Sequence, residues 1–147
     1  MEKIGVKMSD WSRLFSCENI ETPHLLPPLV LAYIGDAVYE LSVRARIVSR
    51  GLTRTDKIHS EAVRYVCAEA QAGILRSIGD FLTEEEAALV RRGRNAKSSH
   101  VPKGASVISY RQSTGLECLV GHLFLKGNPG RLAEVMERVF SVVENRG

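Results

Sequence analysis

The sequence predicts a single all-α domain, and three observations lead to this fold class. The chain has 147 residues, which suits one domain of about 100–150 residues. Apolar residues recur at helical spacing along most of the chain, with capping residues and glycines between the segments. No alternating run is bounded by hairpin turns, so strands are not expected. The 44% hydrophobic and 25% charged residues are those of an ordinary globular protein.

The first expected helix covers residues 27–50. The pair Pro27-Pro28 suits a first turn, where the missing amide hydrogen costs nothing. A basic residue followed by glycine, Arg50-Gly51, is typical of a helix end. Helical spacing predicts one continuous apolar stripe along this helix, formed by Ile34, Val38, Leu41, Ala45 and Val48.

Four further helices are expected after it. The second runs from about Thr55 to Ile78, with Thr53 or Thr55 as its cap. The third begins with a capping box, because Thr83 precedes three glutamates that also favour the positive end of the helix dipole, and it ends near Arg92. The fourth spans about 107–125 and the fifth about 131–143.

Cysteine usage and hydropathy predict a cytoplasmic protein without membrane association. The three cysteines, Cys17, Cys67 and Cys118, are widely spaced and form no CxxC, which argues against a disulfide framework or a zinc site. Reduced thiols are typical of the cytoplasm. No stretch reaches the roughly 18 apolar residues of a membrane span, and the N-terminus lacks the apolar segment of a signal peptide.

The formal net charge of +3 conceals a local concentration of positive charge. Residues 87–116 contain no Asp or Glu and six Lys or Arg, so the rest of the chain carries fourteen basic and seventeen acidic residues. This stretch includes the irregular segment 93–105, which lies between two expected helices. Charges and hydrogen-bond donors together can contact phosphates, although a loop kept soluble by its charge is the alternative. The RNA-binding candidates are Arg91, Arg92, Arg94, Asn95, Lys97, Ser98 and Lys103.

Duplex RNA fits this segment better than single-stranded RNA. Residues 93–105 hold no aromatic side chain on which single-stranded bases could stack. Double-stranded RNA is recognised mainly by shape, phosphate and 2′-hydroxyl contacts, which basic and polar side chains provide.

Asp36 is the most informative residue, since it and Gly35 alone interrupt the apolar run 29–38. A carboxylate within a buried helix is costly unless it is paired or binds a metal. The neighbouring glycine weakens the helix and indicates close packing or a close approach of backbone. Glu40 follows one turn later on the same face. The alternative is a structural Asp36 paired with a residue such as Arg44, and a Glu40 that faces water.

Glu117 repeats this pattern within the apolar stretch 116–125, and Thr114 lies three residues earlier on the same helical face. Two carboxylates from different core helices could converge and offer the hard oxygen ligands that Mg²⁺ prefers. The histidines show no HxxxH or HExxH spacing. No GxSxG elbow or phosphate-binding glycine loop occurs, which argues against nucleotide-dependent chemistry.

Four sequence elements follow one another in order along the chain: LAYIGDAVYEL around Asp36, YVCAEAQA at 65–72, RRGRNAKS at 91–98 and YRQSTGLECLVGHLFL at 110–125. Together they resemble the ribonuclease III family, most closely its small subclass, Mini-ribonuclease III, which lacks a double-stranded-RNA-binding domain. The resemblance covers about residues 22–142.

The resemblance implies a compact helical bundle with the ribonuclease III catalytic-domain fold, one domain over residues 1–147. It implies a homodimer that cleaves both strands of double-stranded RNA with Mg²⁺ and leaves 5′-phosphate ends. The implied substrate is the 23S ribosomal RNA precursor, with a large-subunit ribosomal protein as a candidate helper. Asp36 and Glu117 match the catalytic, metal-binding acids of the family, and the segment 91–103 matches the RNA-contacting loop. By analogy, residues 29–33 are the candidate dimer interface.

The chain departs from the larger family members at three acidic positions. Ala32 and Leu29 replace glutamates four and seven residues before Asp36, and Thr114 replaces an acid three residues before Glu117. Two of four carboxylates therefore remain, which leaves the number of metal ions open.

Glu40 and Thr114 are accordingly candidates for supporting roles. Two other functions stay open: a non-catalytic RNA-binding or ribosome-assembly module on the same fold, and a plain helical interaction protein.

Overall fold

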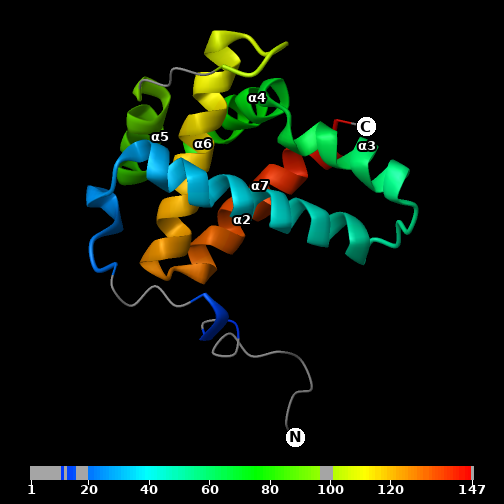
Figure 1. Cartoon of the computed structure of the whole chain (residues 1–147), viewed down its shortest axis with the longest axis horizontal. Coiled ribbons are helices and arrows are strands. Elements are labelled where there is room, and N and C mark those ends of the chain that lie inside the picture. Colours follow the sequence, from blue (N-terminus) through cyan, green and yellow to red (C-terminus); the bar gives the residue numbers. More distant parts are fainter. Residues whose placement is uncertain (1–10, 12, 16–19, 97–100, 147) are drawn as a thin grey trace, which may run out of the picture.

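The computed structural model describes residues 11, 13–15, 20–96 and 101–146. Within these ranges the chain is helical without any strand (Figure 1), which confirms the predicted all-α class. None of the described helices is long and apolar enough to span a bilayer. The helices are η1 (Pro23–Leu25), α2 (Pro28–Ser49), α3 (Thr55–Val66), α4 (Ala68–Ile78), η2 (Gly79–Phe81), α5 (Glu84–Asn95), α6 (Val107–Lys126) and α7 (Pro129–Glu144).

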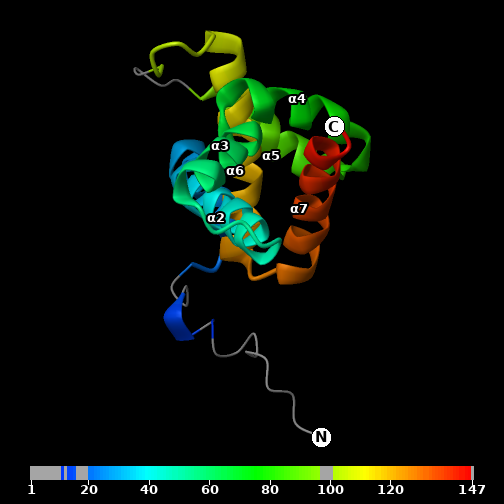
Figure 2. The same cartoon turned by 90° about the vertical axis from the view of Figure 1, so that its right-hand side faces the viewer.

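Helix α6 is the centre of the bundle. It packs against α2, α4, α5 and α7, and Figure 1 shows α2 crossing it while α4 and α5 flank it. Figure 2 shows the C-terminal end of α7 beside α4. Leu116, Leu119 and Val120 are fully buried, so α6 is apolar on nearly every side because it has neighbours on nearly every side.

Glycines let helix α6 approach α2 and α5 closely. At the α2–α6 crossing, a Cβ on Gly35 would overlap the backbone carbonyl of Glu117, and a Cβ on Gly121 would overlap that of Leu31. At the α5–α6 crossing, a Cβ on Gly115 would lie 2.7 Å from the carbonyl oxygen of Val90. The close backbone approach expected at Gly35 is therefore confirmed, and α6 makes such contacts on two sides.

The helix predicted over residues 55–78 is wrong as a single element. The backbone is extended at Cys67, with ψ of 156°, so α3 ends at Val66 and α4 begins at Ala68. Carbonyls left free by the break are bonded by buried side chains. The Tyr39 hydroxyl donates to the Tyr65 carbonyl at 2.6 Å, and Gln71 Nε2 donates to the Val66 carbonyl at 3.1 Å. Such side-chain partners remove the cost of ending a helix there.

The cap of α3 and the buried face of α2 also differ from expectation. The residue before α3 is Arg54, and no side chain caps this helix, so neither Thr53 nor Thr55 serves as its cap. The stripe expected on α2 is not its buried face, since Leu41 is 60% and Val48 56% exposed. Helix α2 is apolar on two faces. The buried face is formed by residues at every fourth position: Leu31, Gly35, Tyr39, Val43 and Ile47.

The capping box predicted at the start of α5 is confirmed. Thr83 Oγ1 accepts from the Glu86 amide at 3.1 Å, and Glu86 Oε1 accepts from the Thr83 amide at 2.9 Å. The Glu86 carboxylate also accepts two hydrogen bonds from the Arg131 guanidinium, at 2.7 and 2.8 Å, which tie α5 to α7. Helix α6 ends as expected near 125, with Gly127 in the left-handed conformation (φ of 74°).

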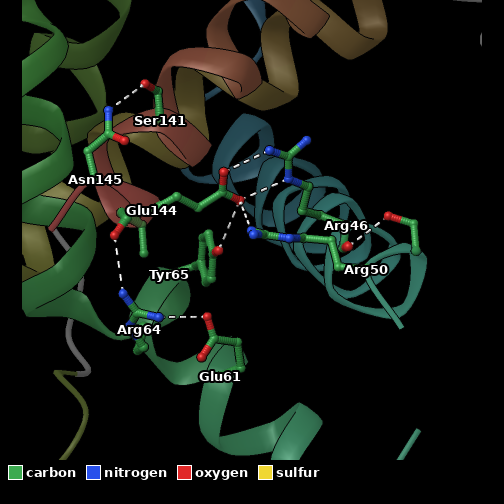
Figure 3. Close-up of polar contacts among 10 residues, drawn as sticks. Arg46, Arg50, Glu61, Arg64, Tyr65, Ser141, Glu144 and Asn145 are labelled. Atoms are coloured by element: carbon green, nitrogen blue, oxygen red, sulfur yellow. Dashed lines mark hydrogen bonds and ion pairs between the residues drawn. The ribbon is translucent and has the colours of Figure 1, made fainter. Parts of the chain in front are cut away.

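A second glutamate–arginine cluster ties the end of α7 to α2 and α3 (Figure 3). Glu144 accepts two hydrogen bonds from Arg46, at 2.9 and 2.7 Å, and forms an ion pair with Arg50 at 2.8 Å. The Tyr65 hydroxyl donates to the same carboxylate at 3.3 Å. Arg64 donates to the Val143 carbonyl at 3.2 Å. These contacts hold the C-terminal end of α7 against α2 and α3.

Candidate active site

Asp36 on α2 and Glu117 on α6 come together where the two helices cross. Because Gly35 packs on the backbone carbonyl of Glu117, the next residue along α2 lies beside the Glu117 side chain. Burial, followed by the charge of Asp36, raises the pKa of Glu117 to about 8, and a hydrogen bond with Asp36 acts in the same direction. The convergence considered from the sequence is therefore found in the structure.

The two acids differ in exposure, and this corrects the sequence-based view of Asp36. Asp36 is an exposed residue, whereas Glu117 is partly buried. The apolar run 29–38 suggested a buried helix, but α2 has one open side, on which Tyr33 is 79% exposed. Because Asp36 reaches solvent, a dissolved ion or a large substrate can reach the carboxylate pair from outside the bundle.

Gln71 is the site residue that sequence reasoning missed. Its side chain is only 2% exposed, and its Nε2 donates to Glu117 Oε2 at 3.2 Å. This hydrogen bond opposes the rise in the pKa of Glu117, because it favours the charged carboxylate. Gln71 lies in one of the four family-like elements, but nothing in the sequence places its side chain against α6.

Of the two supporting candidates, one lies near the pair and the other is directed elsewhere. Glu40 forms an ion pair with Arg44 at 3.5 Å, so Arg44 pairs with Glu40 and not with Asp36. The charge of Glu40 also contributes to the raised pKa of Glu117. Thr114 is buried, and its hydroxyl donates to the Tyr110 carbonyl one turn earlier on α6, at 3.0 Å.

The donor set fits a hard divalent cation with few protein ligands. In the described part of the chain, no three His, Cys, Asp or Glu side chains are grouped so that they could share an ion. A cation placed between the two carboxylates would offset the burial and the Asp36 charge that raise the pKa of Glu117. The Oε1 of Gln71 is a buried acceptor that has no donor within the described part of the chain, so the site also holds one unmatched polar oxygen. Mg²⁺ usually takes one or two carboxylates and keeps several waters.

The basic candidates lie at the end of α5 and in the turn before α6. Arg91, Asn95 and Lys103 are exposed, and Arg94 is partly buried, with its Nε donating to Asn95 Oδ1 at 3.4 Å. Lys97 and Ser98 lie outside the described residues. Helix α5 rests on α6 around Gly115, two residues before Glu117, so the basic end of α5 is held against the stretch of α6 that carries the acid.

Arg92 differs from its neighbours because its guanidinium donates to main-chain carbonyls of a segment distant in sequence. It donates to the carbonyls of His24 and Leu26, at 2.7 and 3.2 Å, and so anchors η1. A shallow groove of ≈ 600 Å³ runs beside it, lined by Pro28, Ala88, Arg91, Arg92, Asn95 and Ala96. The end of α5 thus lines one groove with two arginines: Arg92, which is held by hydrogen bonds, and Arg91, which is exposed.

Comparison with known proteins agrees with this geometry. The ribonuclease III domain model matches residues 29–128. Mini-ribonuclease 3 of Symbiobacterium thermophilum is 49% identical over 126 residues, which is 86% of this chain and 97% of that protein. Mini-ribonuclease 3 of a Thermoanaerobacter species is 49% identical over 98% and 99% of the two chains. A crystal structure of a Fusobacterium nucleatum protein superposes with a TM-score of 0.71 at 25% identity, covering 78% and 93% of the chains.

The matched span includes both Asp36 and Glu117, and the fold is the one that the resemblance implied. The chain therefore belongs to the ribonuclease III family and is an endoribonuclease. Within that family it is a member of the Mini-ribonuclease III subclass, as the identity over nearly the full length of these relatives shows.

Proposed function

We propose that this endoribonuclease cleaves both strands of double-stranded RNA with Mg²⁺ and matures the 23S ribosomal RNA precursor in the cytoplasm. The observation that carries the proposal is the Asp36–Glu117 pair at the α2–α6 crossing. The two acids interact with each other, Glu117 also accepts a hydrogen bond from the neutral amide of Gln71, and Asp36 is exposed to solvent. A site of this kind favours a cation from solution over a cationic side chain of the protein.

Asp36 and Glu117 would hold the ion through their carboxylate oxygens. When bound, Mg²⁺ supplies Lewis-acid stabilisation of the phosphate charge and lowers the pKa of a water. Glu117 would hold the ion as a carboxylate, with its proton released to solvent, and Gln71 Nε2 would donate to that carboxylate. A water would form the new bond to phosphorus as the bond to the 3′ oxygen breaks, and that oxygen would take a proton from solvent, so the products would carry 5′-phosphate and 3′-hydroxyl ends.

Binding of the RNA backbone is assigned to the basic end of α5 and the segment that follows it. Phosphates and sugars would be contacted by Arg91, Arg94, Asn95, Lys97, Ser98 and Lys103. Arg92 would also contact the RNA backbone while it keeps its hydrogen bonds to the carbonyls at η1. Contacts of this kind position a duplex without reading its sequence. Affinity should therefore fall steeply as the salt concentration rises.

A homodimer would supply the two active sites that cutting two strands requires. The N-terminal half of α2 supports this, because Leu29, Val30 and Tyr33 are 39%, 44% and 79% exposed. Exposed apolar side chains that follow one another on a helix indicate a contact surface. In a two-fold dimer the same surface serves both copies. Sedimentation of the wild type at micromolar concentration should give a dimer, and Tyr33→Glu should give a monomer.

The proposal is tested by incubating the protein with a plain RNA duplex and with ribosomal RNA precursor, with and without Mg²⁺, followed by end mapping. Cleavage of both with 5′-phosphate ends is expected. Adding large-subunit ribosomal proteins to the precursor reaction tests the helper. Cleavage of the duplex but not of the precursor would exclude the ribosomal substrate. Tight binding of duplex RNA without cleavage would instead favour a non-catalytic RNA-binding module.

A further inference from the structure

The amide of Gln71 is held on two sides in the interior of the protein. Its Nε2 donates to the Val66 carbonyl at 3.1 Å and to Glu117 Oε2 at 3.2 Å, with the side chain 2% exposed. An amide nitrogen has two hydrogens, so both are used. Because an amide is planar, these two bonds fix the orientation of the whole group.

The first of these two bonds exists because of the break between α3 and α4. In a continuous helix the Val66 carbonyl would accept from the amide four residues later. The extended backbone at Cys67 removes that partner, and the Gln71 side chain takes its place. One end of the amide is thus fixed to main chain and does not depend on the site.

The second bond acts on the Glu117 carboxylate. A neutral donor can orient a carboxylate without cancelling its charge, whereas an arginine would neutralise it, as Arg131 does for Glu86. Glu117 therefore stays available to a cation while one of its two oxygens is held in place. The remaining group of the amide, Oε1, is buried and has no protein donor.

We propose that Gln71 is a positioning residue for the divalent cation: Nε2 orients the Glu117 carboxylate, and Oε1 accepts a hydrogen bond from a water in the site. Oε1 belongs to the same planar amide as the nitrogen that contacts Glu117, so its position is fixed by the same two hydrogen bonds. An unmatched buried acceptor is costly, and a water donor removes the cost. The proposal rests on the proposed metal-dependent function.

The test measures Mn²⁺ binding to the full chain by titration calorimetry, for the wild type and for Gln71→Met, which keeps the length of the side chain without its polar atoms. We expect Mn²⁺ affinity to fall about 10- to 100-fold, the usual effect of losing a group that orients a metal ligand. The Mg²⁺ concentration for half-maximal cleavage should rise in proportion, while cleavage at saturating Mg²⁺ largely recovers. Retention of duplex RNA in Ca²⁺ should not change.

Gln112→Met is the matched control, because Gln112 is partly exposed on α6 and lies outside the site. Wild-type Mn²⁺ affinity in Gln71→Met would overturn the proposal, and so would an equal loss in Gln112→Met. If Gln71→Met does not fold, Gln71→Asn replaces it, since its amide is one methylene too short to reach both acceptors. Mn²⁺ affinity that depends on Gln71 in a chain that cleaves no RNA would refute the proposed function while supporting this role.

Discussion

Carboxylates in two regions of the molecule behave in opposite ways. Glu86 and Glu144 are 8% and 20% exposed, and each accepts two hydrogen bonds from an arginine, which lowers its pKa. Glu117 is partly buried on the central helix, but its neighbours are another acid and a neutral amide, and its pKa is raised to about 8. The same residue type therefore occurs with and without a cationic partner in one small bundle.

The presence or absence of a cationic partner separates carboxylates that stabilise the fold from one that has no cation within the folded chain. Glu86 joins α5 to α7, and Glu144 joins α7 to α2 and α3, so their arginines belong to the folded structure. Glu117 contacts α2 and α4 without gaining a cation. An uncompensated pair of acids lowers stability, and it persists where a cation or substrate supplies the compensation.

Neutralising either acid of the pair should have the largest effect, a loss of activity without a loss of stability. Asp36→Asn and Glu117→Gln each remove a charged oxygen ligand, worth several kcal/mol of transition-state stabilisation. Cleavage should fall about 10³-fold, since each 1.36 kcal/mol is a factor of ten. The measurement is the rate of duplex cleavage at saturating Mg²⁺, with RNA binding assayed in parallel.

Glu134→Gln is the control for both variants, because this α7 carboxylate is 63% exposed and pairs with Arg131 at the surface. Its cleavage rate should match the wild type. An Asp36→Asn protein that cuts duplex RNA at the wild-type rate would remove the distinction between the two kinds of carboxylate.

Breaking the Arg131–Glu86 ion pair should reduce the stability of the fold, in contrast to the variants of Asp36 and Glu117. Arg131→Met leaves the Glu86 carboxylate buried without its cation, which costs about 3–5 kcal/mol when one partner of a buried pair is removed. Urea unfolding should show this loss of free energy, and Mn²⁺ affinity should stay unchanged. A variant of wild-type stability would show that Glu86 needs no partner from the chain.

The pH dependence of stability should show the two kinds of carboxylate with opposite signs. Without divalent ions, the folded pKa of Glu117, about 8, lies above its ordinary value of 4.5. The contribution of Glu117 to the free energy of unfolding is therefore complete below about pH 4.5 and is lost as the pH rises through 8. The pKa of Glu144 is lowered by Arg46, so its contribution is present above that ordinary value and is lost as pH falls.

Urea unfolding at several pH values checks these two slopes. Glu117→Gln should flatten the slope of stability between about pH 4.5 and 8 and leave the slope below pH 4.5 unchanged. Added Mg²⁺ should flatten the same upper slope in the wild type. An unchanged upper slope in Glu117→Gln would show that Glu117 does not carry the effect.

The smallest effect is expected at the basic end of α5. Arg91→Ala removes one exposed charge, so RNA affinity should fall severalfold and the slope of log affinity against log salt should decrease by about one. Arg92→Ala should add a loss of stability, because Arg92 also bonds the His24 and Leu26 carbonyls. Filter binding over a salt series, together with thermal unfolding, separates the two. Equal melting temperatures for the two variants would contradict the second role of Arg92.

The sequence predicted the parts of this site that depend on local pattern. Asp36 and Glu117 each interrupt an apolar helical run, and Gly35 marks the crossing that joins them, so the pair could be predicted. The break at Cys67 could not, because residues 55–78 keep one helical period and contain no proline. The break depends on Tyr39, which is distant in sequence. Gln71 was missed for the same reason, since its role follows from where the break directs it.

The main-chain contacts at Gly35, Gly115 and Gly121 have a consequence for how this enzyme can diversify. Where backbone touches backbone, the spacing between helices does not depend on the size of the surrounding side chains. Substitutions among the buried leucines and valines around α6 can then shift thermal stability while the two acids keep their separation. Lineages of this protein are therefore free to adapt to different growth temperatures by changing the core, with the three glycines as the fixed points.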